Sequence, residues 1–304
     1  WLGTIWGGKL TLNTPMLFAL GFIGMFVIGG LSGVTHSVVP ADTQQTDTYY
    51  IVAHFHYVLF GGALFGIFSG LYFWFPKVWG RMYNETMGKI HFWLMIIGFN
   101  LTFGPMHWLG LQGQVRRTWV YAEETNLGFW NLIVTIGAFI LAIATLVFMA
   151  NWIYSRRKGE VAPFDPWDAR TIEWSIPSPT PVWNFSNAPE VKSLDDFWHQ
   201  KYGEDEDGRA VRREGTDELL LQLEEEGLNP KEEIHLPSPS YFPVIMAFGL
   251  PFLGYAIIYK SIPLALIGVI MLLIGGFGWG TEPLEEEFES SEEEPESGES
   301  KNYE

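Results

Sequence analysis

The sequence contains no cysteine among its 304 residues. The chain can therefore form no disulfide, no iron–sulfur cluster and no thiolate metal site. Any metal ion must bind through histidine, carboxylate or methionine side chains. Without thiols, cysteine usage says nothing about the redox compartment.

The chain also lacks the usual features of a complete N-terminus. Its first residues, WLGTIWGGKL, contain neither a basic segment nor a small-residue cleavage site, so we expect no signal peptide. The chain begins with Trp1 rather than Met. We therefore expect it to be a fragment of a longer protein.

Net negative charge is concentrated at the end of the chain. Residues 281–304 carry eleven Glu and one Lys, a net charge of -10 out of -17. Such a stretch cannot bury enough apolar surface to offset its ordering entropy, so we predict an acidic disordered tail. The simplest role of this tail is to solubilise the protein; the alternative is adaptation to salt, which predicts acidic soluble loops on the other membrane proteins of the organism.

Long apolar runs are the main positive feature of the sequence. Each is about 20 residues or longer, enough to cross a hydrocarbon layer of about 30 Å as a helix. The runs lie at residues 15–34, 50–76, 89–111, 126–153, 241–259 and 262–280. The sequence thus predicts an all-α fold, a polytopic membrane helix bundle, and a multi-pass integral membrane protein.

The spacing of these runs predicts four parts of the chain. Residues 1–154 hold four spans with short loops, and residues 155–240 form a polar cytoplasmic segment. Residues 241–280 form a two-helix membrane hairpin, and residues 281–304 form the tail. In the polar segment, TDELLLQLEEEG predicts a short amphipathic helix from a Thr216 cap to a Gly227 stop. We expect Thr14 to cap the first span, with Pro15 at its first helical position.

Basic residues orient the predicted bundle. They lie before the first span, between the second and third spans, and after the fourth span, at Lys9, Lys77, Arg81, Lys89, Arg156, Arg157 and Lys158. By the positive-inside rule, these ends are cytoplasmic. The outer loop at residues 112–125 breaks the rule with Arg116 and Arg117. This pair indicates an anionic partner; the alternative is contact with lipid phosphates or with the nearby glutamates.

Two histidines lie one residue apart in the apolar stretch YYIVAHFHYV. Because a helix turns about 100° per residue, His54 and His56 point about 200° apart and cannot share one metal ion. They could bind two metal centres on either side of the helix, each ring donating its second N–H to a partner. The alternative is that each ring only hydrogen-bonds a neighbouring helix. Haem suits the pattern, since axial imidazole holds its iron and cationic residues match its propionates.

Several longer motifs make the chain resemble a known family. The stretches TDTYYIVAHFHYVL, GKIHFWLMIIGFNLTFGPMHWLGLQG, RR and PWDARTIEWSIPSP resemble subunit I of the haem–copper terminal oxidases. The resemblance covers the carboxy-terminal third of that subunit, its last four transmembrane helices and the segment after them, through about residue 187. The final hairpin looks similar to two-helix accessory elements fused to, or found beside, some prokaryotic oxidases.

The resemblance implies roles for the histidine pair and its surroundings. His54 would be the axial ligand of a high-spin haem at the oxygen site, and His56 an axial ligand of a low-spin haem. Phe55 would lie between the two haems. Arg116 and Arg117 match an arginine pair that contacts haem propionates.

The resemblance also implies two roles for carboxylates in the outer loop. Asp47 matches a ligand of a magnesium or manganese site near the subunit II interface. The family usually has histidine before this aspartate, whereas this chain has Thr46, which leaves the occupancy of the metal site open. Asp42 aligns with a carboxylate of the hydrated region above the propionates, and we predict that it belongs to the proton-exit network.

As a whole, the resemblance implies the catalytic subunit of a respiratory oxidase that reduces O2 to water with electrons from cytochrome c, coupled to proton translocation. The cofactors would be two haems of the a type and a copper ion whose ligands lie outside this chain. The expected partners are subunits II and III, cytochrome c or another donor, and membrane lipid, with no nucleic acid. The expected location is a prokaryotic plasma membrane, and this part alone is not expected to be active.

Three alternatives remain at this stage. A quinol-oxidising member of the same family is disfavoured by DTYY and the Asp47 position. A di-haem electron carrier without oxygen chemistry would lack the copper ligands and the tyrosine that the family carries on earlier helices. A transporter or purely structural bundle would show no haem absorbance.

Overall fold

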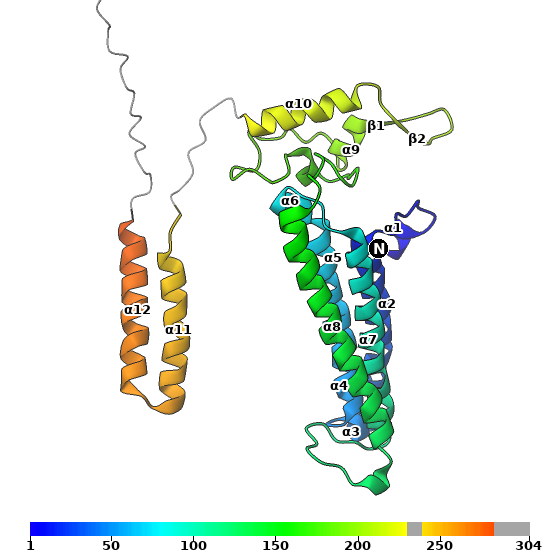
Figure 1. Cartoon of the computed structure of the whole chain (residues 1–304), viewed down its shortest axis with the longest axis vertical. Coiled ribbons are helices and arrows are strands. Elements are labelled where there is room, and N and C mark those ends of the chain that lie inside the picture. Colours follow the sequence, from blue (N-terminus) through cyan, green and yellow to red (C-terminus); the bar gives the residue numbers. More distant parts are fainter. Residues whose placement is uncertain (230–238, 283–304) are drawn as a thin grey trace, which may run out of the picture. The chain divides into compact units, whose positions relative to one another are not determined.

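The computed structural model describes residues 1–229 and 239–282 (Figure 1). The chain divides into two compact units, Trp1–Asn229 and Pro230–Glu304. Two predicted parts extend beyond the described residues. They are the acidic tail from residue 283 onward and the end of the polar segment at residues 230–238.

The described residues are mostly helical. The first unit holds the helices α1 (Leu2–Ile5), α2 (Thr14–Ser37), α3 (Val39–Gln45), α4 (Tyr49–Val58), α5 (Phe65–Phe73), α6 (Phe75–Trp79), α7 (Glu85–Leu111), α8 (Gly128–Lys158), α9 (Asp196–Lys201) and α10 (Thr216–Leu228). It also holds a π-helical turn η1 (Leu59–Leu64), the 3-10 turns η2 (Glu123–Thr125) and η3 (Ile172–Ser175), and an antiparallel pair of strands, β1 (Tyr202–Glu204) and β2 (Ala210–Arg212). The second unit holds α11 (Phe242–Tyr259) and α12 (Ile262–Thr281).

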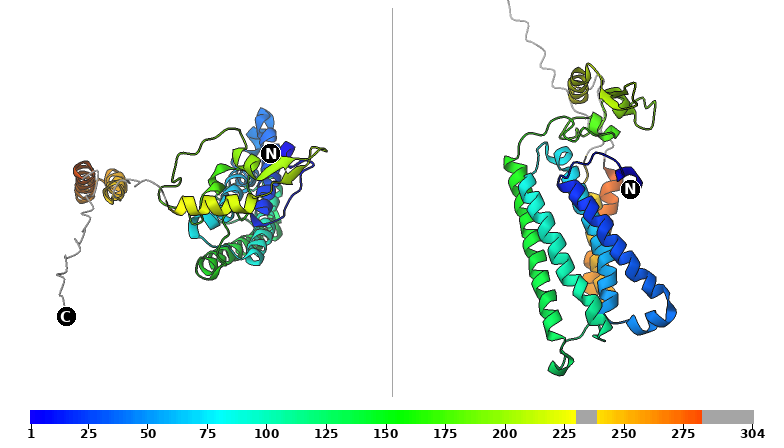
Figure 2. Two further views of the ribbon diagram at one scale, coloured as in Figure 1. Left: turned by 90° about the horizontal axis from the view of Figure 1, so that it is seen from above. Right: turned by 90° about the vertical axis from the view of Figure 1, so that its right-hand side faces the viewer.

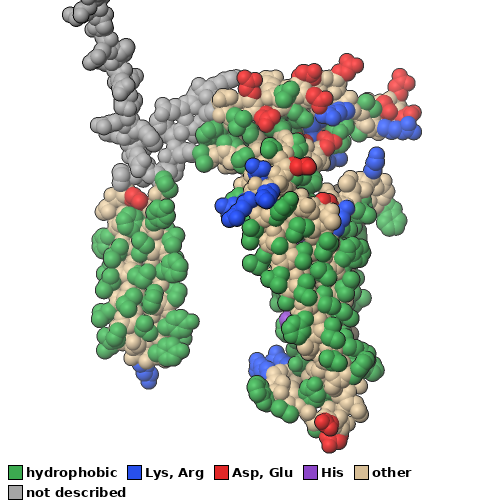
Figure 3. All heavy atoms as spheres, in the orientation of Figure 1, with side chains coloured by type: hydrophobic (Ala, Val, Ile, Leu, Met, Phe, Trp, Pro, Cys, Tyr) green, Lys and Arg blue, Asp and Glu red, His purple; other side chains and the backbone are tan. Residues whose placement is uncertain are grey.

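The predicted all-α membrane bundle is confirmed. In the described part of the chain, six helical segments are long and apolar enough to cross a membrane, at Thr14–Ser37, Tyr49–Phe73, Glu85–Leu111, Gly128–Lys158, Phe242–Tyr259 and Ile262–Thr281. The second of them combines α4, η1 and α5. Their outward surface is covered by hydrophobic side chains (Figure 3), as contact with lipid requires.

Four of these segments run side by side in the first unit (Figures 1 and 2). Their shared core is aromatic, with Phe18, Phe65, Phe99 and His91 all at 0% exposure. Helices α7 and α8 approach closely at Gly137, where an added Cβ would lie 2.5 Å from the Thr102 nitrogen. Small residues at such contacts are typical of membrane helices, because packing rather than the hydrophobic effect holds them together.

The first span starts one residue earlier than predicted. Asn13 is the N-cap, and its side chain accepts the Met16 N–H at 3.2 Å. Thr14 is the first helical residue, and it is fully buried. Its N–H and Oγ1–H donate to the carboxylate of Glu85 at 3.0 and 3.1 Å. The nonlocal bond to Glu85 therefore uses the hydroxyl that the prediction assigned to the cap.

Two buried lysines hold the segment after α8 in place. Lys77 Nζ donates to the Ile176 carbonyl at 2.5 Å and lies 4.9 Å from the Trp174 ring centroid. Burial lowers the pKa of Lys77 to about 8. Lys201, at 0% side-chain exposure, pairs with Asp165 at 2.6 Å and with Asp168 at 2.9 Å.

The Lys201 contacts join residues 163–180 to the small layer formed by α9, the strands and α10, which comprises residues 184–229 and is called here the cap (Figure 1). Tyr202 also donates its hydroxyl proton to Asp168. Burial would raise the pKa of Asp168, but the hydrogen bonds from Tyr202 and Lys201 outweigh it and lower the pKa. The cap therefore attaches through charged and hydrogen-bonded groups.

The short helix predicted in the polar segment is present as α10, with different ends. Its N-cap is Gly215, at a φ of 81°, in place of Thr216. The Thr216 hydroxyl donates to the backbone carbonyls of Lys201 and Arg213 at 3.1 and 2.7 Å. Gly227 lies inside the helix, where a Cβ would come within 2.5 Å of Pro177 Cδ. Close packing on Pro177, and not termination of the helix, therefore explains this glycine.

The described residues of the second unit form a helical hairpin. Helices α11 and α12 pack through Gly249 and Gly268, where a Cβ on Gly249 would lie 2.9 Å from the Gly268 carbonyl oxygen. The turn between them passes through Lys260, which adopts a left-handed conformation with a φ of 49°. The hairpin has the two-helix form that the sequence predicted.

Candidate haem-ligating site

Both histidines of the AHFHYV stretch lie on α4, in the N-terminal half of the second span. The helix starts directly after Thr48, whose side chain accepts the Tyr50 N–H at 3.2 Å and caps the first turn. The π-helical turn η1 follows immediately after Val58, and such turns frequently occur at functional sites. No local pattern in the sequence predicted η1.

His54 faces helix α2. Its Nδ1 lies 3.0 Å from the Gly29 carbonyl oxygen and 2.9 Å from Ser32 Oγ. A carbonyl oxygen can only accept, so Nδ1 carries the proton of a neutral ring and Nε2 keeps the lone pair. Nε2 has no hydrogen-bond partner among the described residues.

His56 faces helix α7. Its Nδ1 lies 2.7 Å from the Val52 carbonyl oxygen, one turn earlier in α4. Its ring stacks on Phe103 of α7 at a centroid distance of 4.1 Å and an interplanar angle of 14°. The same argument leaves the lone pair on Nε2, which makes no hydrogen bond within the described part of the chain.

The chemistry of this donor set fits haem. Each ring is half-buried, is held through Nδ1, and presents one unprotonated Nε2. The described residues contain no group of three or more His, Cys, Asp or Glu that could hold a metal ion. Each histidine would therefore give a single ligand to its own metal centre, which is what axial ligation of a haem iron requires.

The arginine pair lies in the loop after α7. Arg116 forms an ion pair with Asp47 through its side chain, and its N–H donates to the Asp47 carbonyl at 2.8 Å. Its Nε is buried and has no partner. Arg117 is exposed, adopts a φ of 64°, and has no ion-pair partner in the part of the chain that the structure describes. The loop thus retains donor capacity for an anion.

Asp42 is connected to the histidine pair by a third histidine, His36, which lies beside both Asp42 and His54. His36 Nδ1 is 3.3 Å from Asp42 Oδ1, within ion-pair distance, although neither ring nitrogen of His36 makes a hydrogen bond. The His36 ring is 5.0 Å from that of His54, centroid to centroid. Thr46 donates to Asp42 at 3.0 Å, so its hydroxyl is directed at Asp42 and not at Asp47.

Three residues of this site were not identified from the sequence. Gly29 and Ser32 hold the His54 ring, and Phe103 supports the His56 ring. Gly29 and Ser32 belong to the stretch IGGLSG, which reads simply as small residues at a helix contact. Nothing in the local sequence links them to a histidine on another helix.

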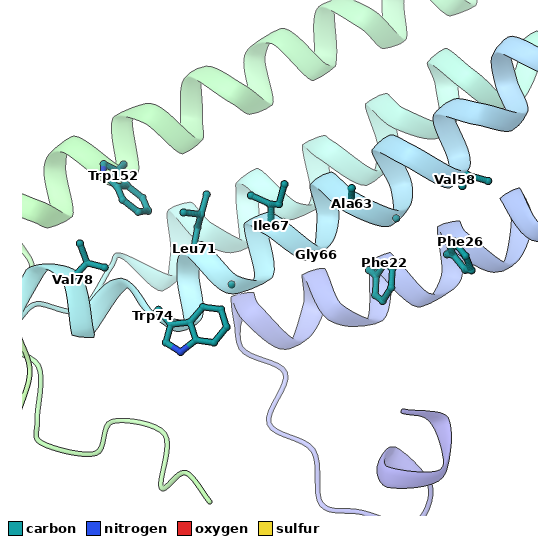
Figure 4. Close-up of a pocket in the computed structure, with 12 residues that line it drawn as sticks. Phe22, Phe26, Val58, Ala63, Gly66, Ile67, Leu71, Trp74, Val78 and Trp152 are labelled. Atoms are coloured by element: carbon teal, nitrogen blue, oxygen red, sulfur yellow. The ribbon is translucent and has the colours of Figure 1, made fainter. Parts of the chain in front are cut away.

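An apolar groove lies on the surface of the same bundle, lined by α2, α5 and neighbouring segments (Figure 4). It has a volume of about 770 Å³, and its walls include Phe22, Phe26, Gly66, Ile67 and Trp74. No titratable side chain lines it. The groove is therefore suited to an apolar chain or helix and not to metal or acid–base chemistry.

The fold and the histidine geometry define a polytopic integral membrane protein with a pair of imidazole side chains on one helix. The family model of cytochrome c and quinol oxidase polypeptide I matches residues 1–140. The chain belongs to this family, the subunit I family of the haem–copper terminal oxidases.

Several curated relatives are similar over most of the chain. Cytochrome c oxidase subunit 1 of Alkalihalophilus pseudofirmus is 43% identical over 277 residues, covering 91% of this chain and 42% of the relative. That of Synechocystis is 52% identical over 189 residues, covering 62% of this chain and 34% of the relative. Quinol oxidase subunit 1 of Bacillus subtilis is 37% identical over 278 residues, covering 90% of this chain and 40% of the relative. The chain thus spans about 42% of the length of its first relatives.

Proposed function

We propose that this chain is part of the catalytic subunit of a respiratory cytochrome c oxidase, which reduces O2 to water and couples this to proton translocation. The observation that carries the proposal is the histidine pair on α4. Each ring is fixed through Nδ1 and presents a free Nε2, one beside α2 and the other beside α7. One helix can thus serve two separate haems.

In this proposal, His54 holds the high-spin haem and His56 the low-spin haem, with Phe55 between them. When bound, the haems supply the electron transfer and oxygen reduction chemistry, together with a copper ion held outside this chain. The protein orients each imidazole, excludes water with the aromatic core, and fixes the Nδ1 protons on carbonyl oxygens. We assign the haems to the a type.

Arg116 and Arg117 would hold the anionic propionates at the outer surface. The unpartnered Arg116 Nε and the exposed Arg117 support this assignment, because guanidinium groups bind carboxylates through charge-assisted hydrogen bonds. Asp47 remains a proposed ligand of a magnesium or manganese ion, and would have to share its carboxylate between the ion and Arg116.

The proposed partners are oxidase subunits II and III, cytochrome c as the electron donor, and the lipid of a prokaryotic plasma membrane. The donor proposal follows the names of the more similar relatives, which are cytochrome c oxidases. A quinol-oxidising enzyme is the second candidate, supported by the 37% identical relative. Oxidation of reduced cytochrome c and of a quinol by the intact complex would separate the two.

The test of the haem assignment is replacement of each histidine in the complete subunit I. His56→Ala should abolish the low-spin signal in the reduced-minus-oxidised spectrum and leave the high-spin signal, and His54→Ala should do the reverse. The opposite pattern would show that the two assignments are interchanged. Retention of both haems in both variants would overturn the proposed function.

Asp42 is proposed to take part in proton exit. It carries a negative charge beside His36, which lies next to His54. Asp42→Asn keeps the size and removes the charge, so we expect oxygen reduction to continue with a reduced number of protons released per electron. The measurement is proton release by the oxidase reconstituted in vesicles, and unchanged pumping would contradict the role.

A further inference from the structure

Ser32 lies beside His54 in a position that allows it to tune this ligand. We propose that Ser32 is a positioning residue that supplies a second hydrogen-bond acceptor to the Nδ1 proton of His54. The hydroxyl would thereby orient the imidazole and raise the electron density on Nε2. The inference rests on the proposed function, in which His54 holds a haem iron.

The three groups form a closed triangle. His54 Nδ1 is 2.9 Å from Ser32 Oγ and 3.0 Å from the Gly29 carbonyl oxygen. The Ser32 hydroxyl donates its proton to the same Gly29 carbonyl at 2.9 Å. Its one proton is thereby used, so the oxygen turns a lone pair toward the imidazole N–H.

The packing around the triangle leaves the ring little freedom. Ser32 is only 6% exposed, so water cannot readily replace its hydroxyl. A Cβ on Gly33 would lie 3.0 Å from His54 Cε1, and a Cβ on Gly29 would lie 2.9 Å from the Val58 nitrogen. The glycines let α2 approach α4 closely, and Ser32 is the side chain that makes a polar contact with the ring.

A hydrogen-bond acceptor at Nδ1, the ring nitrogen that does not bind the metal, changes the strength with which Nε2 donates electrons to the metal. A hydrogen bond from Nδ1–H fixes the tautomer and increases the basicity of Nε2. His54 has two such acceptors, whereas His56 has the Val52 carbonyl alone and an aromatic ring against its face. Loss of the Ser32 hydroxyl should therefore affect only the metal bound by His54.

The test uses the intact oxidase with variants of Ser32 in the complete subunit I. In Ser32→Ala we expect the iron–histidine stretching band in the resonance Raman spectrum to move to lower frequency. We also expect the midpoint potential of the high-spin haem to rise, with the low-spin haem unchanged. Ser32→Thr keeps the hydroxyl and should retain the wild-type band and potential.

A matched control removes a hydroxyl elsewhere in the bundle. Ser69 on α5 donates to the Pro15 carbonyl at 2.8 Å and makes no hydrogen bond to either histidine, so Ser69→Ala should leave the band in place. If Ser32→Ala does not assemble, Ser32→Cys replaces it, because the weaker acceptor should give a smaller shift in the same direction.

The outcomes separate this inference from the proposed function. Both haems present with an unshifted band and potential in Ser32→Ala, or in Ser32→Cys where it takes its place, would overturn the role of Ser32 and leave the oxidase proposal standing. An equal shift in Ser32→Thr would also overturn it, because packing and not the hydroxyl would then be responsible. Absence of any iron–histidine band dependent on His54 would instead refute the haem assignment.

Discussion

At the scale of single residues, the histidine pair connects two hypotheses that the sequence left as alternatives. His54 does hydrogen-bond a neighbouring helix, through Gly29 and Ser32. That bond uses Nδ1 and so leaves Nε2 as a ligand atom. The structural contact and the proposed metal ligation are therefore compatible, since the first sets the tautomer needed for the second.

Lys201 is the residue whose burial makes the clearest prediction. Its ammonium group is inaccessible and pairs with Asp165, which is itself 2% exposed. Lys201→Met would leave the Asp165 carboxylate buried and without its partner, and removing one member of a buried pair typically costs about 3–5 kcal/mol. We expect the cap to detach, measured as faster limited proteolysis between residues 184 and 229 in the intact complex.

The control for this prediction is another lysine of the same segment. Lys192 pairs with Glu190 at the surface, where both side chains are more than half exposed. Lys192→Met should leave the proteolysis rate unchanged, because surface ion pairs contribute little. Equal rates for Lys201→Met and Lys192→Met would show that the buried pair does not hold the cap.

At the scale of elements, glycines decide how closely the helices pack. Gly110, near the end of α7, meets the start of α4, where an added Cβ would lie 2.1 Å from the Tyr50 nitrogen. Tyr50 lies one turn before His54 on the same helix. The position of α4, and with it that of both histidines, therefore depends on this contact.

Gly110→Ala should move α4 away from α7. Overpacking of this kind typically costs about 1–3 kcal/mol, so we expect a lower melting temperature of the oxidase and weaker haem retention, both measured by absorbance during heating. Gly24→Ala is the matched control, because nothing lies within 4 Å of a Cβ on Gly24. A Gly110→Ala enzyme as stable as the Gly24→Ala enzyme would contradict this account.

At the scale of the whole molecule, the chain consists of two compact units. Every residue proposed to contact a haem lies in the first, and the described residues of the second form a glycine-packed hairpin. We therefore expect a subunit I that ends after Asn229 to keep both haem signals in its reduced-minus-oxidised spectrum. Loss of either signal in the truncated oxidase would show that the hairpin is needed to form the haem sites.

The sequence by itself determined the membrane spans and the histidine pair. Span length and hydropathy are local properties, because a helix must satisfy its own backbone in lipid. The one-residue spacing of His54 and His56 likewise sets their divergence on any helix. The sequence did not show that Asn13, and not Thr14, caps the first span. Thr14 bonds to Glu85 instead, and Glu85 is 71 positions away in the chain.

Only the tertiary structure decided what surrounds the histidines. Ser32 and Phe103 reach the two rings from α2 and α7, and a one-dimensional pattern of small and aromatic residues does not say which helices meet. The tertiary structure also revealed that Asp47 pairs with Arg116 and that Lys201 is buried. The physical reason is that hydrogen bonds and ion pairs between distant segments depend on the final packing distances, whereas helix formation in a membrane depends on the segment alone.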